Sequence, residues 1–209
     1  AGGKVVVVAR DEEKLAEVRK KIADFGGSAK TYSCDITDYA ANDKLAKDIL
    51  KDFGPVDVLV NNAGRSIRRS LALSYDRFHD FERTMQLNYF ACVRLTMNLL
   101  PSMTARKSGH VINVSSIGVL TNAPRFSAYV ASKAALESLA RCAASEFHDE
   151  GVQFTIINMP LVRTPMIAPT KIYENVPTLS PEEAAGLVVD EQWTDDAGDF
   201  LLTLAHPYC

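Results

Sequence analysis

Tyr129 and Lys133 are the two residues of this 209-residue chain whose types and spacing best suit acid–base chemistry. They are four apart in a segment with helical periodicity, which places both side chains on one helix face, one turn apart. A phenol has an ordinary pKa of about 10, and a neighbouring ammonium lowers this value by stabilising the phenolate. The pair therefore predicts a tyrosine that exchanges protons near neutral pH. The same spacing also occurs by chance on exposed helices, so this prediction needs support from other residues.

Two polar segments that follow predicted strands supply this support. Ser116 comes just after an apolar run over residues 110–114, and Asn61-Asn62-Ala63-Gly64 follows another over residues 56–60. The carboxyl ends of strands in a parallel sheet form the edge at which ligands bind. We therefore expect Ser116 to hold a substrate carbonyl against the proton of Tyr129.

The elements that must position these residues alternate between apolar strands and amphipathic helices. This alternation is typical of a doubly wound parallel sheet with helices on both faces, a three-layer α/β/α fold. We expect strands over residues 5–8, 30–34, 56–60, 110–114 and 152–158, and helices after Asp11, after Asp38, over residues 75–103 and over residues 128–146. One domain over residues 1–191 is predicted, and residues 192–209 lack periodicity and remain unassigned.

Composition and charge exclude several classes of protein. The chain has 23 Lys and Arg against 26 Asp and Glu, a net charge of −3, which excludes a strongly basic nucleic-acid-binding protein. No apolar run reaches the roughly 18 residues that a membrane span needs. The histidines and cysteines show no metal-ligand spacing, so we expect no metal site. The cysteines are scattered along the chain, at Cys34, Cys92, Cys142 and Cys209. This distribution predicts reduced thiols in a cytoplasmic protein.

The chemistry-bearing residues together resemble the short-chain dehydrogenase/reductase family, which has a Rossmann-like fold. The residues that match, in the family's order and spacing, are Asp35, Asn61 to Gly64, Asn88, Ser115-Ser116, Tyr129, Lys133, Pro160 and Thr164. The resemblance implies that Tyr129 is the general acid/base and that Lys133 binds the nicotinamide ribose and lowers the pKa of the tyrosine. It also implies that Ser116 polarises the carbonyl, with Ser115 facing the sheet. Asn88 is expected to hold a water in a proton relay.

The cofactor that the residues favour is NADP(H). Arg10 follows the first strand, where an NAD-binding protein would carry a carboxylate, and a guanidinium there matches a 2′-phosphate. Alternatively, Arg10 is a surface charge beside a helix. The resemblance places Asp35 at the adenine, Ile36 beside that ring and Asn62 beneath the cofactor. The other cofactor-binding residues that it implies are Ala63, Gly64, Tyr129, Lys133, Pro160 and Thr164.

The chain departs from the family in two places. The family's first strand and Gly-rich turn are absent, so we expect an omitted N-terminal stretch and a gap at the centre of the sheet. Pro160-Leu161 also stands where the family has Pro-Gly. The runs over residues 64–70 and 160–166 resemble the branch that contains bacterial fatty acyl-CoA reductases, in which this Pro-Leu pair is expected.

Two segments bear on the substrate. Residues 161–179 lie where the family keeps its substrate lid, and they are apolar, which suits an apolar substrate. Packing against the domain or a second subunit is the alternative. Arg65, Arg68 and Arg69 could meet phosphates or form a solvated loop. We predict an NADPH-dependent reductase of an acyl thioester or other carbonyl, most simply a fatty acyl-CoA/fatty aldehyde reductase.

Two alternatives to this prediction remain open. One is a 3-oxoacyl or other ketone reductase that uses the same residues. The other is a non-catalytic fragment or pseudoenzyme, which the missing turn favours and the intact set of four catalytic residues opposes. The family resemblance also implies a homodimer or homotetramer built through the long helices, which could form part of a larger chain.

Overall fold

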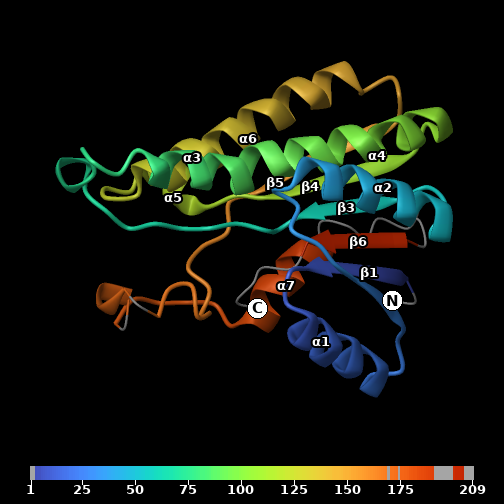
Figure 1. The fold of residues 1–209 in the computed structure, drawn as a ribbon, viewed down its shortest axis with the longest axis horizontal. Coiled ribbons are helices and arrows are strands. Elements are labelled where there is room, and N and C mark those ends of the chain that lie inside the picture. Colours follow the sequence, from blue (N-terminus) through green and yellow to red (C-terminus); the bar gives the residue numbers. More distant parts are fainter. Residues whose placement is uncertain (1–2, 169, 174, 191–199, 205–209) are drawn as a thin grey trace.

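A parallel sheet is the centre of the molecule. The computed structural model describes residues 3–168, 170–173, 175–190 and 200–204. Within them the strands lie in the order β2-β1-β6-β3-β4-β5, and all neighbouring pairs are parallel (Figure 1). The strands are β1 (Lys4–Ala9), β2 (Ala29–Ser33), β3 (Val58–Asn61), β4 (Gly109–Val114), β5 (Val152–Ile157) and β6 (Phe200–Leu204). The predicted doubly wound α/β fold is confirmed.

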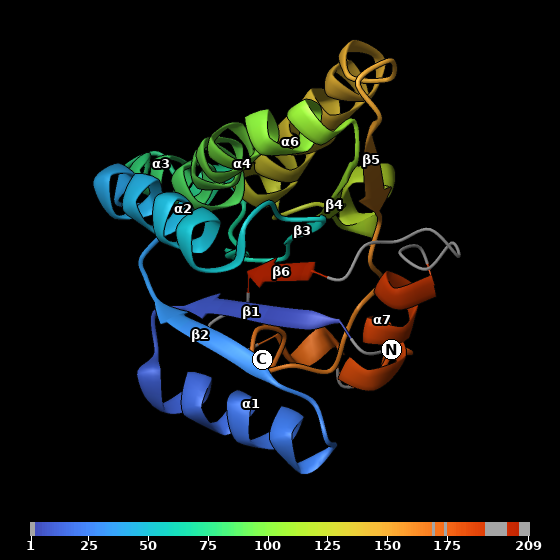
Figure 2. The ribbon, with the colours of Figure 1, turned by 90° about the vertical axis from the view of Figure 1, so that its right-hand side faces the viewer.

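Helices cover both faces of this sheet (Figure 2). One face carries α1 (Glu12–Asp24) and α7 (Pro181–Asp190). The opposite face carries α2 (Tyr39–Phe53), α3 (His79–Met85), α4 (Cys92–Arg106) and α6 (Ser127–Glu146), while the short α5 (Ile117–Thr121) follows β4. Short turns complete the order: 3₁₀ turns at η1 (Leu71–Leu73) and η3 (Lys171–Tyr173), and a π-helical turn at η2 (Gln86–Ala91).

The central strands are apolar because both of their faces are buried. Leu59 of β3 is fully buried in the core that α2 and α4 cover. Its neighbours Val58 and Val60 point to the other side, where they pack with β4 residues and with Val188 of α7. Successive side chains of a strand point to opposite faces, so a continuously apolar run is what a two-sided sheet requires.

The predicted helix starts are confirmed at two aspartates. The Asp11 carboxylate accepts a hydrogen bond from the Lys14 amide at 3.1 Å and caps α1. Asp38 accepts from the amides of residues 40 and 41 at 2.9 and 3.1 Å and caps α2. A side-chain oxygen at this position satisfies amides that have no partner inside the helix.

The long helix expected over residues 75–103 differs in the structure. It begins at His79, and the π-helical turn η2 separates α3 from α4. Such turns insert one extra residue into a helix and often occur at functional sites. Here the turn contains Asn88, one of the predicted catalytic residues.

The expected gap beside β1 is filled by β6. Leu201 is the register partner of Val5 on one side and of Val58 on the other, so β6 joins the two halves of the sheet. Residues 200–204 of the unassigned tail are therefore one of the two central strands of the described sheet, beside β3 (Figure 2). The rest of that tail, residues 192–199 and 205–209, lies outside the described residues. Across the part of the chain that is described, every helix is too short or too polar to cross a membrane.

Candidate active site

Ser116 and Tyr129 meet at the carboxyl edge of β4. Ser116 follows this strand and caps α5, with its hydroxyl oxygen accepting a hydrogen bond from the Gly118 amide at 3.1 Å. Tyr129 lies in the first turn of α6, and the Ser116 side chain is close enough to its phenol to lower the pKa of that phenol. The structure thus brings together the predicted carbonyl-polarising residue and the predicted acid.

Lys133 is buried beneath the loop that follows β3. Its side chain lies one turn after Tyr129, and its ammonium donates a hydrogen bond to the Val114 carbonyl at 2.6 Å. A Cβ atom on Gly64 would lie 3.5 Å from Lys133 Nζ and 3.5 Å from Asn88 Oδ1. A Cβ atom at residue 64 would therefore make ordinary van der Waals contact with both predicted catalytic residues, so the loop after β3 lies directly against them.

The Asn88 side chain is held entirely by protein groups. Its Oδ1 accepts from the Arg65 amide at 2.7 Å, while Nδ2 donates to the Arg65 carbonyl and to Ser132 Oγ, both at 2.9 Å. These bonds fix the loop after β3 against α6. The relay water expected at Asn88 stays a prediction.

Burial controls the ionisation of Tyr129 and Lys133. Desolvation raises the pKa of the Tyr129 phenol, and the Ser116 side chain only partly offsets this effect. Desolvation also lowers the pKa of the Lys133 ammonium, against the opposing influence of Cys92 and Glu137. The sequence predicts that Lys133 lowers the pKa of Tyr129. In this structure the loss of water around the phenol is the larger effect, so the net shift is upward.

The ends of β3 and β4 are joined by hydrogen bonds between buried side-chain amides. The sequence motif includes Asn61, but this role of its side chain was not predicted. Asn61 donates through Nδ2 to Asn113 Oδ1 at 2.8 Å and to Thr96 Oγ1 at 3.2 Å. Asn61 and Asn113 are also register partners in the sheet. This network fixes the relative position of the two strand ends that lead to Gly64 and Ser116. The signal for this network in the sequence is an asparagine near the carboxyl end of each strand, which is Asn61 in β3 and Asn113 in β4.

The predicted cofactor residues of the first two strands lie side by side. The Arg10 guanidinium is 3.7 Å from the Asp35 carboxylate, and both side chains are about half exposed. Burial alone would raise the pKa of Asp35, but hydrogen bonds from Thr37 and the charge of Arg10 hold it below its ordinary value. Ile36, by contrast, is only 5% exposed and packs in the core. Its side chain therefore has little surface left for the adenine contact that the sequence predicts.

The remaining predicted cofactor residues follow β3 and β5. Asn62 is half-buried after β3, and its amide bonds the Val60 carbonyl at 3.1 Å, while Ala63 is buried beside it. Pro160 is exposed and Thr164 half-buried in the segment after β5. All of these residues thus follow carboxyl ends of strands on one edge of the sheet.

The predicted lid, residues 161–179, reaches the tyrosine through aromatic rings. Tyr173 stacks on Phe126 with ring centroids 6.5 Å apart, and Phe126 meets Tyr129 edge-on at 6.5 Å. At its base the segment closes on itself, because the Leu179 amide bonds the Leu161 carbonyl at 2.8 Å and the Leu179 carbonyl accepts from Arg163 at 2.9 Å. The lid is therefore a closed loop whose tip lies against the active-site helix.

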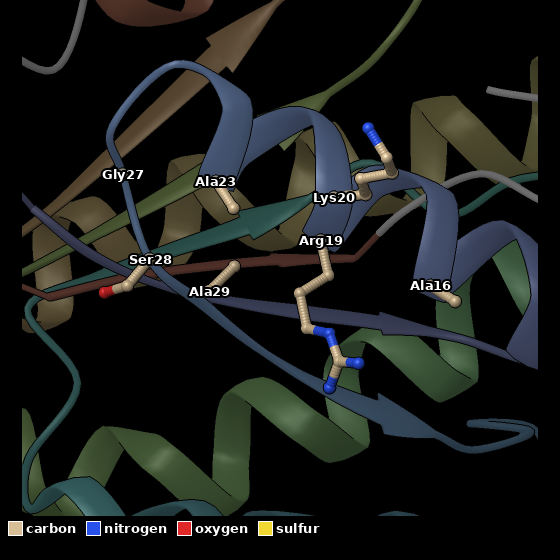
Figure 3. Close-up of a pocket in the computed structure, with 7 residues that line it drawn as sticks. All are labelled: Ala16, Arg19, Lys20, Ala23, Gly27, Ser28 and Ala29. Atoms are coloured by element: carbon tan, nitrogen blue, oxygen red, sulfur yellow. The ribbon is translucent and has the colours of Figure 1, made fainter.

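A shallow groove of about 360 Å³ lies elsewhere, between α1 and the chain that leads into β2 (Figure 3). Its walls are Ala16, Arg19, Lys20 and Ala23 of the helix and the backbone over residues 27–29. Arg19 and Lys20 leave the helix in different directions, so their charges do not converge on one point (Figure 3). The groove contains none of the predicted site residues. Among the residues with assigned positions, no cluster of His, Cys, Asp or Glu could hold a metal ion.

A doubly wound parallel sheet with a Ser-Tyr-Lys group at its carboxyl edge defines a Rossmann-like oxidoreductase. Residues 1–174 match the family described as short chain dehydrogenase. The chain belongs to this family, whose members are NAD(P)-dependent oxidoreductases.

Several curated proteins are similar to this chain over most of its length. A fatty acyl-CoA reductase of Acinetobacter baylyi is 61% identical over 189 residues, which are 90% of this chain and 64% of the relative. An uncharacterized oxidoreductase of Mycobacterium bovis is 54% identical over 193 residues, 91% of this chain and 57% of the relative. A fatty acyl-CoA reductase of Mycobacterium tuberculosis is 50% identical over 186 residues, 88% of this chain and 63% of the relative. The chain thus spans only 57% to 64% of the length of these relatives.

Solved structures share the fold. A short-chain dehydrogenase from Streptomyces avermitilis superposes with a TM-score of 0.79 at 28% identity, covering 97% of this chain and 89% of that protein. A metagenomic short-chain oxidoreductase in complex with NADP gives a TM-score of 0.78 at 28% identity, covering 98% of this chain and 85% of that protein.

Proposed function

We propose that this protein is an NADPH-dependent reductase that converts the thioester of a fatty acyl-CoA to an aldehyde. The observation that carries the proposal is the juxtaposition of Ser116 and Tyr129 beside the lid of residues 161–179. The relatives described as fatty acyl-CoA reductases support the choice of substrate.

The residues at the carboxyl edge fit a nicotinamide cofactor. Gly64 leaves a backbone surface over Lys133 and Asn88 that a side chain at that position would fill. Arg10 is half exposed after β1, where its guanidinium suits a 2′-phosphate. When bound, the cofactor supplies a hydride to the carbonyl carbon. We assign Arg10, Asp35, the loop over residues 62–64, Pro160 and Thr164 to its binding, and Lys133 would hold its ribose.

The chain's own residues hold the carbonyl and supply the proton. Ser116 and Tyr129 donate hydrogen bonds to the substrate oxygen, and Tyr129 passes its proton to this oxygen as negative charge develops there. The raised pKa of Tyr129 keeps the phenol protonated before the reaction. With a thioester the product of this step is a hemithioacetal, whose carbon–sulfur bond then breaks. As the carbonyl re-forms, the hydroxyl proton returns to Tyr129 and the leaving sulfur takes up a proton. The products are an aldehyde and a free thiol, so one hydride and one proton are consumed for each thioester.

The surroundings of Tyr129 suit a long apolar chain with a charged end. Tyr173 and Phe126 supply aromatic surface beside the tyrosine, and Met166 is half-buried in the lid. Arg68 is exposed and close enough to Tyr173 for its charge to lower the pKa of that phenol, although burial raises it overall. We assign Arg68 to the phosphates of coenzyme A, which lie outside the apolar lid.

We also propose that the protein forms a homodimer or homotetramer. The support is exposed apolar surface on and before α4, where Phe90 is 46% and Met97 64% exposed. Light scattering tests this part of the proposal, and a monomer at all concentrations would contradict it.

The deciding experiment is incubation of this chain with NADPH and hexadecanoyl-CoA. We expect hexadecanal and free coenzyme A in equal amounts, detected by chromatography, and no product from Tyr129→Phe. Reduction of a 3-oxoacyl thioester at its ketone, with no aldehyde from hexadecanoyl-CoA, would instead identify a ketone reductase. No turnover of either compound would favour the non-catalytic alternative.

A further inference from the structure

Glu137 is a buried carboxylate on the active-site helix. It lies one turn after Lys133 and is only 4% exposed. Its Oε1 accepts hydrogen bonds from the Ser115 hydroxyl and, at 2.7 Å, from Asn158 Nδ2, while Oε2 lies 3.4 Å from Arg141 Nη1. A buried charge is costly unless it is paired and hydrogen-bonded, so this carboxylate needs all of these partners.

These partners come from three different elements. Ser115 directly precedes Ser116 at the end of β4, and its amide also bonds the Ile157 carbonyl of β5 at 2.8 Å. Asn158 follows β5, and its Nδ2 lies 3.4 Å from the Ser116 carbonyl as well. Glu137 therefore links α6 to the segment after β4, which contains Ser116, and to the segment after β5.

The spacing along α6 gives this connection a consequence for the reaction. Tyr129, Lys133 and Glu137 are successive positions of one helix face, four residues apart. Ser116 belongs to the sheet, whereas Tyr129 and Lys133 belong to the helix. The contacts of Glu137 thus determine where the helix face lies relative to Ser116.

The negative charge of Glu137 also affects the Lys133 ammonium. The buried Lys133 ammonium bonds a neutral carbonyl, that of Val114. The titratable groups that act on it are Cys92, at the start of α4, and Glu137 on its own helix. Glu137 accepts hydrogen bonds from Ser115 after β4 and from Asn158 after β5, and both of these side chains are neutral. Its charged partner, Arg141 on α6, is exposed. Glu137 forms its ion pair with Arg141, and its charge one turn from Lys133 acts to raise the pKa of the lysine.

We propose that Glu137 is a positioning residue for carbonyl reduction, which fixes Ser116 against Tyr129 and places a negative charge one turn from the Lys133 ammonium. It touches neither substrate nor cofactor and acts through Ser115, Asn158 and Lys133. The proposal rests on this site being a carbonyl-reducing one, but not on which carbonyl compound is reduced.

The test compares two substitutions that separate hydrogen bonding from charge. Glu137→Gln keeps an oxygen acceptor for Ser115 and Asn158 and removes the charge, whereas Glu137→Ala removes both. Glu146→Gln, at an exposed position near the end of the same helix, is the matched control. Circular dichroism and thermal unfolding establish the folded fraction of each variant, and kcat and KM are expressed per folded protein.

Different results are expected for the two variants. For Glu137→Ala we expect kcat to fall at least tenfold with KM nearly unchanged, because Ser116 loses its alignment. For Glu137→Gln we expect a smaller loss of kcat and a descending alkaline limb of the pH profile that moves to lower pH, because the charge that favours the Lys133 ammonium is lost. Wild-type values of kcat and of the pH profile in both folded variants would overturn the proposal, whatever their melting temperatures.

A second measurement does not depend on turnover. NMR of protein labelled with ¹⁵N-lysine follows the titration of Lys133 Nζ, which Lys133→Arg assigns. We expect Lys133 to titrate at a lower pH in Glu137→Gln than in the wild type, and at the wild-type pH in Glu146→Gln. An unchanged titration would overturn the charge part of the proposal. Because no substrate is present, this result stands even when hexadecanoyl-CoA proves to be the wrong substrate.

Discussion

The guanidinium of Arg10 lies 3.7 Å from the carboxylate of Asp35, across the carboxyl ends of β1 and β2. The residue that we assign to a 2′-phosphate is thus next to the residue that we assign to the adenine. A half-exposed ion pair of this length contributes little to stability, so both groups remain available to a ligand. This relationship leads to the first prediction.

Arg10→Ala should weaken NADPH binding about tenfold, which corresponds to about 1.4 kcal/mol, and change NADH binding less than twofold. The reason is that the 2′-phosphate, which NADH lacks, loses its guanidinium partner. Titration followed by nicotinamide fluorescence measures both affinities, with Lys20→Ala on the outer side of α1 as the control. Equal losses for the two cofactors would contradict the assignment.

Tyr129→Phe should reduce kcat by about a hundredfold to ten-thousandfold, since general acid catalysis contributes two to four orders of magnitude. The NADPH affinity should stay within twofold of wild type, because the ring remains and only the hydroxyl is lost. Steady-state kinetics and the same fluorescence titration give the two quantities. A variant that keeps most of its activity would rule out Tyr129 as the acid.

Tyr173→Ala should raise KM for hexadecanoyl-CoA about fivefold, because the aromatic stack on Phe126 contributes about 1 kcal/mol. Tyr173→Phe keeps the ring and should behave like wild type. The effect should shrink as the acyl chain is shortened to butanoyl-CoA. An equal effect at every chain length would show that the lid does not contact the acyl chain.

Arg68→Ala should raise KM for hexadecanoyl-CoA about fivefold and leave KM for the pantetheine thioester of the same acid unchanged. The pantetheine compound lacks the nucleotide phosphates, so only the coenzyme A ester loses an ion pair. Raising the salt concentration should likewise reduce the preference of the wild type for the coenzyme A ester over the pantetheine ester. The same increase for both thioesters would place the phosphates elsewhere.

Asp80→Asn should lower the free energy of unfolding at pH 7 by about 2 kcal/mol. The Asp80 side chain is 3% exposed and pairs with Arg69 at 3.3 Å, Arg77 at 3.1 Å and Arg83. Burial alone would raise the pKa of this carboxyl, but the Arg77 hydrogen bond and the neighbouring positive charges hold it below its ordinary value.

A lowered pKa in the folded state stabilises the protein above the unfolded value of about 3.9, and this contribution is lost as the pH falls below it. The difference between wild type and Asp80→Asn should therefore shrink between pH 5 and pH 3. Urea unfolding at several pH values measures this, with the exposed Asp76→Asn as the control. A difference that does not depend on pH would mean that charge is not the cause.

Much of the fold and of the site could be predicted because it depends on residues close together in the chain. The periodicity of β3 and β4, the caps Asp11 and Asp38, and the one-turn spacing of Tyr129 and Lys133 all follow from local geometry. The position of Ser116 at a strand end follows from the rule that parallel strands share one edge. These features place the predicted catalytic residues together without any knowledge of distant contacts.

Other features could not be predicted because they depend on burial and on contacts between distant segments. The π-helical turn at Asn88, the core position of Ile36 and the central place of residues 200–204 have no distinct local pattern. The upward shift of the Tyr129 pKa has the same origin, since no sequence pattern states how much water a phenol loses.

Local patterns in the chain are enough to predict the strands and helices around the site, and the spacing of Ser116, Tyr129 and Lys133. How these residues are held depends on contacts between distant segments: Ser115 donates to Glu137, Asn158 after β5 donates to the same carboxylate, and Gly64 lies against Lys133. The physical reason is that helical and strand periodicity act over a few residues. Hydrogen bonds to a buried charge, in contrast, require the packing of whole elements.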